Sequence, residues 1–410
     1  MGVIFNIEQS ARLSDFNILQ EPIKMILENE VEAFEKGSII PEVFVQKTTD
    51  RYMEEYRSST SMDGFKPTED MEVAGLSDFE ESYFQQYTTQ IWTNSFAVSK
   101  QTMEDNKMMD IDTKSMGFIK SYGRTREHYA VAAISNALKH NEAYEEAYKL
   151  YSKHGKGMDT TDGTIEGTRQ QYFHNKHRTV KLRDGRWFDK DGNVVPKGTS
   201  GAKQYIEQSN KFYAEQADKS LLSFTSNVAD LEEKVLDVIG QVEAKMAVYR
   251  DDKGNIVPVD VNKIVTGKNY RLVDILMRGL KSKYGAAMEG NGINTQYGKY
   301  KVITNAYLSG VAGFSNDECG LLLISDDRNR EGLGAVWFDR VPLTVRSYID
   351  QKNEANVWAG RARFGAGFGD FRAMSYIAFP QTDAAKTAVS ENADPITPTT
   401  TGVKAVKNVQ

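Results

Sequence analysis

The chain has 410 residues, enough for two or three compact units, and 40% of them are apolar, so it can bury a sizeable core and is not a disordered protein. With 51 basic and 57 acidic side chains its formal net charge is −6, which provides no general attraction for nucleic acid or anionic lipid. The single cysteine, Cys319, excludes an intrachain disulfide. No secretory signal or run of 18 apolar residues is present, and we expect synthesis and folding in a cytoplasm.

The first 40 residues are expected to form an arm with one short helix. Pro22 suits a first helical turn, apolar residues then recur at helical spacing, and Gly37 is typical of a helix end. These signals predict a helix from Pro22 to Lys36. Because so short a helix is marginal alone in water, we expect it to lie against another surface.

Residues 43–100 have the pattern of two strands that carry a long connection. The segments Phe44–Arg57 and Tyr83–Val98 are rich in β-branched and aromatic residues. Residues 58–82 between them are polar and acidic, with turn signals, and connections this long are usually functional or disordered. The residues expected to share one face of the second strand are Tyr87, Thr89, Ile91 and Thr93.

Beyond residue 100, helical and strand-like segments follow one another. Helical spacing predicts helices within 108–150, with Gly123 as a bend, at 228–246 after a cap at Ser226 or Asn227, and near 270–280. A loop-rich stretch at 155–201 and a hairpin near 253–254 separate them. The strands predicted for the last part of the chain are 264–265, 300–304, 321–325, 335–346 and 357–379. The Thr-, Ala- and Pro-rich tail at 381–410 is expected to be extended or flexible.

The glycine-rich and calcium-like motifs do not fit their chemical templates. Gly365, Gly367 and Gly369 have the wrong third spacing for a dinucleotide fingerprint, and a strand-like run follows them, so they predict a tight β-corner. The run that begins at Asp189 resembles the start of a calcium loop but lacks the closing Glu, and a hairpin turn explains it better.

Metal and nucleophile templates also fail. His174 and His177 lack further ligands at zinc spacings and are interpreted as partly exposed histidines in a turn. Cys319 is interpreted as a small apolar residue, since a catalytic cysteine needs partners that the sequence does not show. The sequence therefore predicts no catalytic residue, no cofactor and no metal site.

The order of elements resembles that of the Hong Kong 97-type capsid fold of tailed bacteriophages. An arm, a long β-excursion, a long helix, a helix-and-sheet unit and a β-rich return correspond to the family's N-arm, E-loop, spine helix, axial domain and returning peripheral strands. The segments with the closest local resemblance are Ser209–Met246 with Asp251–Val259, Ile264–Tyr270, Tyr297–Leu308, and Asp350–Arg372 with Trp358, Gly360, Arg361, Arg363 and Asp370. The resemblance covers about residues 1–380.

This resemblance implies an α+β fold with an N-arm, an E-loop β-hairpin, a peripheral domain with a long spine helix, and an axial domain. The implied division is an arm at 1–42, the E-loop at 43–100, the peripheral domain at 101–207, the axial domain at 208–335, returning peripheral strands at 336–380 and a C-terminal tail at 381–410. Some family members cross-link their subunits through an E-loop lysine. Lys66 lies on the candidate E-loop, but no partner asparagine or acid is identified for it.

The implied function is that of a major capsid protein without catalytic activity, which self-assembles into an icosahedral virion shell around double-stranded DNA. Its partners would be its own copies in hexamers and pentamers, with scaffolding, portal and decoration proteins and packaged DNA bound without sequence specificity, and no membrane. About 40 residues precede the E-loop, which implies a separate scaffolding protein or none. Two alternatives stay open: an encapsulin-like cellular nanocompartment shell and an unrelated cytoplasmic enzyme.

The excursion supplies the candidate contacts between subunits. In residues 58–82 the only base is Lys66, against the acids Asp63, Glu69, Asp70, Glu72, Asp78, Glu80 and Glu81. Such a segment cannot bury enough apolar area to fold alone, yet apolar residues recur through it. We expect a neighbouring subunit's peripheral domain to order it. The candidate contact residues are Phe65, Lys66, Met71, Val73, Leu76 and Phe79.

Overall fold

The computed structural model describes residues 4–7, 17–59, 81–105, 108–138, 172–175, 177–178, 187–189, 193–203, 206–215, 228–251, 255–282, 294–332, 334–391 and 393–398. The chain divides into two compact units, one of residues 1–56, 84–134 and 335–369, the other of residues 57–83, 135–334 and 370–410. Both units combine helices with sheets, so the predicted α+β class is confirmed. Among the described residues, no helix has both the length and the apolar character that a membrane crossing requires.

The first unit is built on a five-stranded sheet with two long strands at its centre. β14 and β15 form an antiparallel hairpin, and β5 runs antiparallel along β15. β2 and β1 both run parallel to β14, beside its first and second halves. The strands are β1 (Ile4–Ile7), β2 (Val45–Thr48), β5 (Gln90–Val98), β14 (Ala335–Asp350) and β15 (Ala355–Phe368). Segments from the two ends of the sequence therefore share one sheet.

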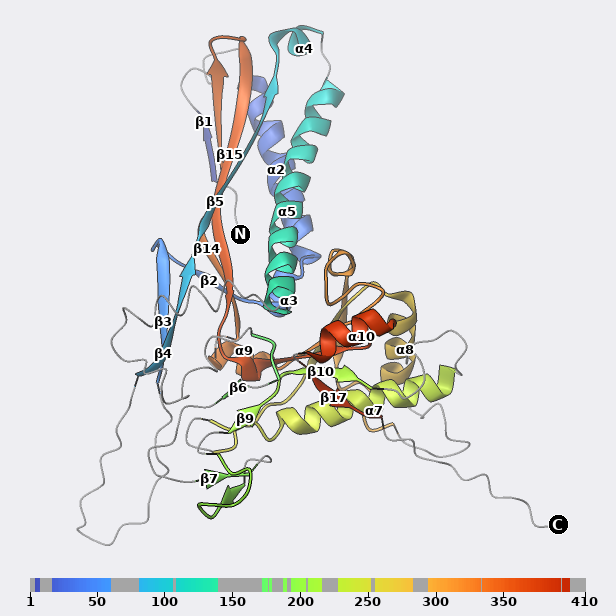
Figure 1. Cartoon of the computed structure of the whole chain (residues 1–410). Coiled ribbons are helices and arrows are strands. Elements are labelled where there is room, and N and C mark those ends of the chain that lie inside the picture. The colour runs from blue at the N-terminus through green and yellow to red at the C-terminus, as the bar shows by residue number, and fades with distance from the viewer. Residues whose placement is uncertain are drawn as a thin grey trace, which may run out of the picture. The chain divides into compact units, whose positions relative to one another are not determined.

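Helices cover one face of this sheet. Figure 1 shows α2 (Asn17–Lys36) and α5 (Met108–Leu138) side by side along it, while α3 (Ile40–Val43) and α4 (Lys100–Glu104) are short. Trp92 of β5 meets Tyr129 of α5 edge-on, with ring centroids 5.5 Å apart. The Trp358 indole N–H of β15 donates to Gln20 Oε1 of α2 at 3.2 Å. Aromatic side chains of the sheet thus anchor both helices.

The predicted β-excursion is present as strands that leave the five-stranded sheet. β3 (Met53–Ser59) follows β2 after a short turn, and β4 (Glu81–Thr88) leads into β5. β3 and β4 pair with each other as a separate two-stranded sheet. Each of the two predicted strands is therefore divided in two, with breaks at residues 49–52 and at Thr89.

The second unit contains a six-stranded mixed sheet in the order β12-β11-β13-β16-β10-β17. Its strands are β10 (Lys211–Ala214), β11 (Lys263–Gly267), β12 (Lys301–Asn305), β13 (Leu321–Ile324), β16 (Met374–Ala378) and β17 (Asp394–Ile396). The helices α7 (Val228–Met246) and α8 (Tyr270–Lys281) pack on it through apolar residues such as Val238 and Leu276. The predicted helices at 228–246 and 270–280 are confirmed.

Short elements complete this unit. They are β6 (His177–Arg178) paired with β9 (Glu207–Gln208), β7 (Trp187–Phe188) paired with β8 (Val194–Val195), α9 (Asp326–Gly332), α10 (Asp383–Ser390) and the single turns at Leu308–Gly310 and Phe371–Ala373. The hairpin turn predicted from Asp189 is confirmed, since β7 and β8 flank it and Asn193 donates its backbone N–H to Asp189 Oδ1 at 2.8 Å.

Three predictions about local structure are wrong at the N-terminal helix, β5 and the tail. α2 begins at Asn17, and Pro22 lies inside it on the exposed side. Tyr87 and Thr89 are buried but Ile91 and Thr93 are exposed, because the break at Thr89 reverses the alternation between β4 and β5. The tail forms α10 and β17, since Thr382 caps the helix by accepting from the Ala385 N–H.

The glycine cluster and Gly123 serve close packing. Gly365 and Gly367 lie within β15 rather than at a corner, and a Cβ on Gly367 would lie 2.0 Å from the Tyr87 ring. A Cβ on Gly123 would lie 2.5 Å from the Phe34 ring of α2, so Gly123 allows the two helices to approach. We therefore assign Gly123 to helix packing instead of the predicted bend.

Two glycines of α5 should respond oppositely to alanine. Gly117 is exposed and its Cβ would meet nothing within 4 Å, so Gly117→Ala should raise the free energy of unfolding by about 1 kcal/mol. Gly123→Ala should lower it by about 1–3 kcal/mol, because the new methyl group collides with Phe34. Denaturant titrations followed by circular dichroism measure both changes. Equal changes in the two variants would contradict this packing.

Candidate functional site

The predicted contact residues lie outside the described part of the structure. Phe65, Lys66, Met71, Val73, Leu76 and Phe79 all belong to residues 60–80, between β3 and β4. The structure therefore gives the two strands that carry this segment and says nothing of the candidate residues themselves. The first unit carries a described surface that could receive such a segment.

The face of the five-stranded sheet opposite the helices carries polar and basic side chains. The strand register places Ile4, Thr344, Arg361 and Thr93 in one row across four strands. The next row contains Asn6, Arg346, Ala359 and Ser95. Alternation along each strand directs these residues away from the face that the helices cover. We call the surface made by these two rows, with Arg363, Ile91, Tyr52 and Tyr348, the open face.

Arginines dominate the charge of the open face. The two rows contain two arginines and no acid, and Arg363 lies beside Ile91 on the neighbouring strand. The Arg363 guanidinium carbon lies 5.8 Å from the centroid of the Tyr52 ring. The Arg346 guanidinium carbon lies 5.5 Å from the centroid of the Tyr348 ring. No ion pair among the described residues involves Arg361 or Arg363. Their charge is available to an external partner.

Apolar side chains accompany these arginines. Tyr52 is 61% exposed and Ile91 is 54% exposed. Such residues next to Arg361 and Arg363 are suited to bind a segment that combines carboxylates with apolar side chains, because burial and charge pairing then act together. The sequence signal for this face was weak, since alternation in β15 is visible but the pairing of β15 with β5 is not.

The covered face contains a buried ion pair. Arg126 of α5 lies 3.3 Å from Asp339 of β14 and donates to the Tyr122 hydroxyl at 3.0 Å. The guanidinium also lies over the Trp337 and Phe364 rings, 5.2 and 5.6 Å from their centroids. Burial raises the pKa of the Asp339 carboxyl, and the charge of Arg126 only partly offsets this. The pair joins α5 to the sheet, and loss of one partner would leave a buried charge uncompensated.

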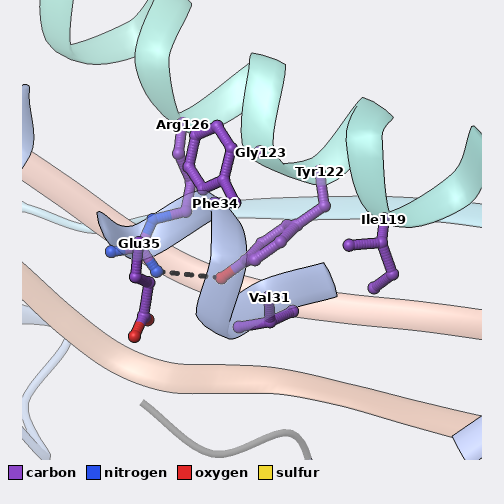
Figure 2. A pocket seen from close by; sticks show the side chains of 7 residues that line it. All are labelled: Val31, Phe34, Glu35, Ile119, Tyr122, Gly123 and Arg126. Carbon is purple, nitrogen blue, oxygen red and sulfur yellow. Dashed lines mark hydrogen bonds between the residues drawn. The ribbon is translucent and has the colours of Figure 1, made fainter. Parts of the chain in front are cut away.

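A small hollow lies beside this ion pair. Figure 2 shows it between α2 and α5, with the Phe34 ring against Gly123 and Arg126 bonded to Tyr122. Its volume is about 10 Å³, the space of about one water molecule. Sites for organic ligands have volumes of hundreds of Å³, so this hollow does not fit a substrate or a cofactor.

In the second unit, Asp370 forms ion pairs with two arginines. It bonds Arg328 and lies 3.2 Å from Arg372 Nη1, and it accepts the Arg372 backbone N–H at 3.1 Å. Burial alone would raise the pKa of this carboxyl, but the two guanidinium groups more than offset burial and leave the pKa below its ordinary value. Asp370 lies two residues after the end of β15 and caps the single turn Phe371–Ala373, so the group fixes the start of this turn before β16.

Two groups that could signal catalysis have structural explanations. Lys211 is buried, which lowers its pKa to about 8, and its ammonium donates to the Leu138 carbonyl at the end of α5 at 3.0 Å. A cation there is favourable because it faces the negative end of the helix dipole. Burial raises the pKa of the Cys319 thiol to about 12, which disfavours the nucleophilic thiolate.

His177 also has a structural role. It is buried rather than partly exposed, as its ring stacks on Phe371 and Nε2 bonds to Asn210 Oδ1 at 2.9 Å. Asn210 also donates to the Tyr172, Phe371 and Met374 carbonyls, so it organises the centre of this unit. Within the described ranges, no group of three or more His, Cys, Asp or Glu residues is arranged to hold a metal ion.

Comparison with known proteins gives structural relatives only. No family model matches the sequence, and no curated protein matches it. The capsid of Ralstonia phage GP4 is 13% identical, with a TM-score of 0.46 over 83% of this chain and 87% of that one. The capsid of cyanophage P-SCSP1u is 7% identical, with a TM-score of 0.44 over 84% and 88%. A virus-like particle from Pyrococcus furiosus is 7% identical, with a TM-score of 0.41 over 87% and 98%.

The Asp370 group predicts a dependence of stability on pH. The pKa of Asp370 in the folded state lies below its unfolded value of about 3.9, so the unfolded chain takes up this proton first as pH falls. The ionised carboxyl therefore stabilises the folded state fully above pH about 3.9. This stabilisation is lost as pH falls through the folded-state pKa. Asp370→Asn should lower stability at pH 7 by about 3 kcal/mol, as expected when one partner of a buried ion pair is removed. It should also flatten the acid limb of the stability curve.

Thermal melts at a series of pH values measure this effect. Asp260→Asn, at an exposed position of the same unit, is the matched control and should behave as the unmodified protein. An Asp370→Asn protein with unchanged stability at pH 7 and an unchanged acid limb would show that the three charges do not stabilise the unit.

Proposed function

We propose that this chain is the major capsid protein of a tailed bacteriophage, a subunit whose copies form hexamers and pentamers in an icosahedral shell around double-stranded DNA. One observation carries the proposal. β3 and β4 leave the five-stranded sheet and, among the described strands, pair with each other alone. A two-stranded sheet alone is marginally stable in water, so a second surface should cover it. In a shell of identical subunits that surface belongs to another copy.

The order of elements supports the same function. An N-terminal strand and helix, a β-excursion, a long helix beside the sheet, a second helix-and-sheet unit and a long returning hairpin follow in the sequence. This is the order that the resemblance to the Hong Kong 97-type capsid fold implies. We propose the corresponding division into arm, E-loop, peripheral domain, axial domain and returning strands, and a structural role without catalysis.

The charge distribution indicates how copies could bind. Residues 60–80 contain six acidic side chains and one basic one, and therefore carry five of the chain's six net negative charges. The open face of the first unit offers Arg361 and Arg363 beside exposed Tyr52 and Ile91. We propose that residues 60–80 of one copy bind the open face of a neighbour. The residues proposed to make the apolar part of this contact are Phe65, Met71, Val73, Leu76 and Phe79.

Each such contact is expected to be weak. An exposed ion pair contributes about 0.2–1 kcal/mol, and ordering the segment costs conformational entropy. Symmetry repeats the contact in every copy, and several attachments held together raise the effective affinity of each. Weak, repeated contacts also allow misplaced subunits to dissociate during assembly. We propose scaffolding, portal and decoration proteins as further partners, assembly in the host bacterial cytoplasm and a final location in the virion.

Assembly of the purified protein tests the proposed function. We expect pentamers, hexamers or closed particles in negative-stain micrographs, because the excursion and the open face both need a partner. Analytical ultracentrifugation gives the mass distribution in solution. A single species at the monomer mass of 46.1 kDa, at high concentration and without particles, would contradict a shell-forming role.

Two variants test the contact between residues 60–80 and the open face. The first replaces 60–80 with a short Gly-Ser turn, and the second is Arg361→Glu/Arg363→Glu. Both should keep the far-UV spectrum and cooperative melting, because neither changes a described core contact, and both should lose the ability to close shells. Particle yield by micrograph counting, with Arg361→Lys/Arg363→Lys as the charge-preserving control, is the measurement.

The outcomes distinguish the alternatives. Closed shells at normal yield from either variant would contradict the proposed contact between residues 60–80 and the open face. They would still agree with the proposal that the protein forms shells. Loss of the folded subunit on deletion would show instead that residues 60–80 belong to the core.

A further inference from the structure

The outward side of α5 is basic. Lys114, Lys120 and Arg124 are exposed, and no described acidic side chain of this helix is exposed. The Arg124 Nε–H donates to the backbone carbonyl of Lys120 at 3.2 Å, a neutral acceptor that does not compensate its charge. Among the described residues no ion pair involves Lys114, Lys120 or Arg124. A helix whose exposed side has one sign of charge has no internal compensation and attracts a surface of opposite sign.

The outward side of the neighbouring α2 carries exposed acids. Glu21 and Glu28 are exposed, and they lie about one turn before and one turn after Met25, which is itself 61% exposed. No ion pair within the described ranges involves Glu21 or Glu28. A large apolar side chain flanked by acids on a helix surface is suited to enter a recess that basic residues flank.

Gly117 leaves the exposed side of α5 without a side chain between two of these bases, and we call this position the recess. It lies between Lys114 and Lys120, three residues from each, and a Cβ built on it would meet nothing within 4 Å. Glycine inside an exposed helix lowers helix stability, and no contact within the described residues requires it here. Its missing side chain leaves room for another backbone or side chain to come close.

We propose that α2 of a second copy packs across the exposed side of α5, with its Met25 seated at Gly117 and its two exposed glutamates paired with the bases of α5. The spacings agree, since four residues along a helix span about 6 Å and three span about 4.5 Å. This contact between copies rests on the proposed self-assembly and uses a different surface from the open face.

The observations favour a second copy over other partners. Two α5 helices in contact would bring like charges together, which is unfavourable. The phosphate backbone of nucleic acid would be attracted by α5 but repelled by the acids of the adjacent α2. A second copy offers the opposite sign for both helices.

Charge reversal with compensation tests the proposal. Lys120→Glu/Arg124→Glu and Glu21→Lys/Glu28→Lys should each weaken assembly at least about tenfold, measured as the protein concentration that gives half-maximal light scattering. The variant with all four changes should recover assembly, because the attraction between copies is restored with its signs exchanged. Lys197→Glu, at an exposed turn of the other unit, is the control and should assemble normally.

A second substitution separates packing from charge. Gly117→Leu should also weaken assembly while the isolated subunit melts cooperatively, because its side chain starts in open space and would occupy the position proposed for Met25 of the second copy. If the unmodified protein does not assemble at all, the proposed function fails. If it assembles and the reversal variants assemble equally well, only the helix contact is overturned. Normal assembly with reduced nucleic-acid content in Lys120→Glu/Arg124→Glu particles would assign this face to nucleic acid instead and overturn the proposal.

Discussion

The long β14–β15 hairpin has two faces, and the helices within the described residues cover one of them. On that face Trp358 bonds Gln20, Phe118 packs where Gly360 lacks a side chain, and Arg126 pairs with Asp339. The strands are 16 and 14 residues long, so the opposite face is also extensive. A sheet face that the chain's described helices do not cover must either be polar or be covered by a partner. The exposed Tyr52 and Ile91 beside the arginines indicate a partner, because exposed apolar side chains grouped together are typical of a binding surface.

The separation of charge within the chain has the same consequence. The net charge of −6 is not spread evenly over the chain, because residues 60–80 alone contribute a net charge of −5. The remainder is nearly neutral but unevenly distributed, with arginines on the open face, bases along α5 and acids along α2. Among the described residues, the exposed acids of α2 and the exposed bases of α5 form no ion pairs with each other. They can meet between copies, where geometry selects the pairs and repetition supplies the stability.

Much of this architecture could be predicted from residue patterns, and the failures have physical causes. Apolar spacing was sufficient for α7 and α8, whose buried sides pack on one sheet. The exposed side of β5 was predicted wrongly because a single break at Thr89 shifts the alternation by one residue. The glycines of β15 were predicted as a corner because Tyr87, the side chain they accommodate, lies about 280 positions earlier.

The candidate site depends still more on contacts between distant parts of the sequence. Arg126 and Asp339 are 213 positions apart, and the register that aligns Arg361 with Thr93 joins strands from opposite halves of the chain. No local pattern contains such pairings. Composition did identify the acidic character of residues 58–82, because that property belongs to one continuous segment, but the basic surface proposed to receive it is assembled only on folding.

The central claim is that the open face is covered by another copy in the assembled protein. A cryo-EM reconstruction of assembled particles tests it most directly, because it locates residues 60–80 and the open face in the same map. The account predicts density for this segment of one copy across Arg361 and Arg363 of its neighbour, with Tyr52 and Ile91 buried beneath it. Closed particles in which the open face remains exposed to solvent, or in which residues 60–80 contact only their own subunit, would contradict it.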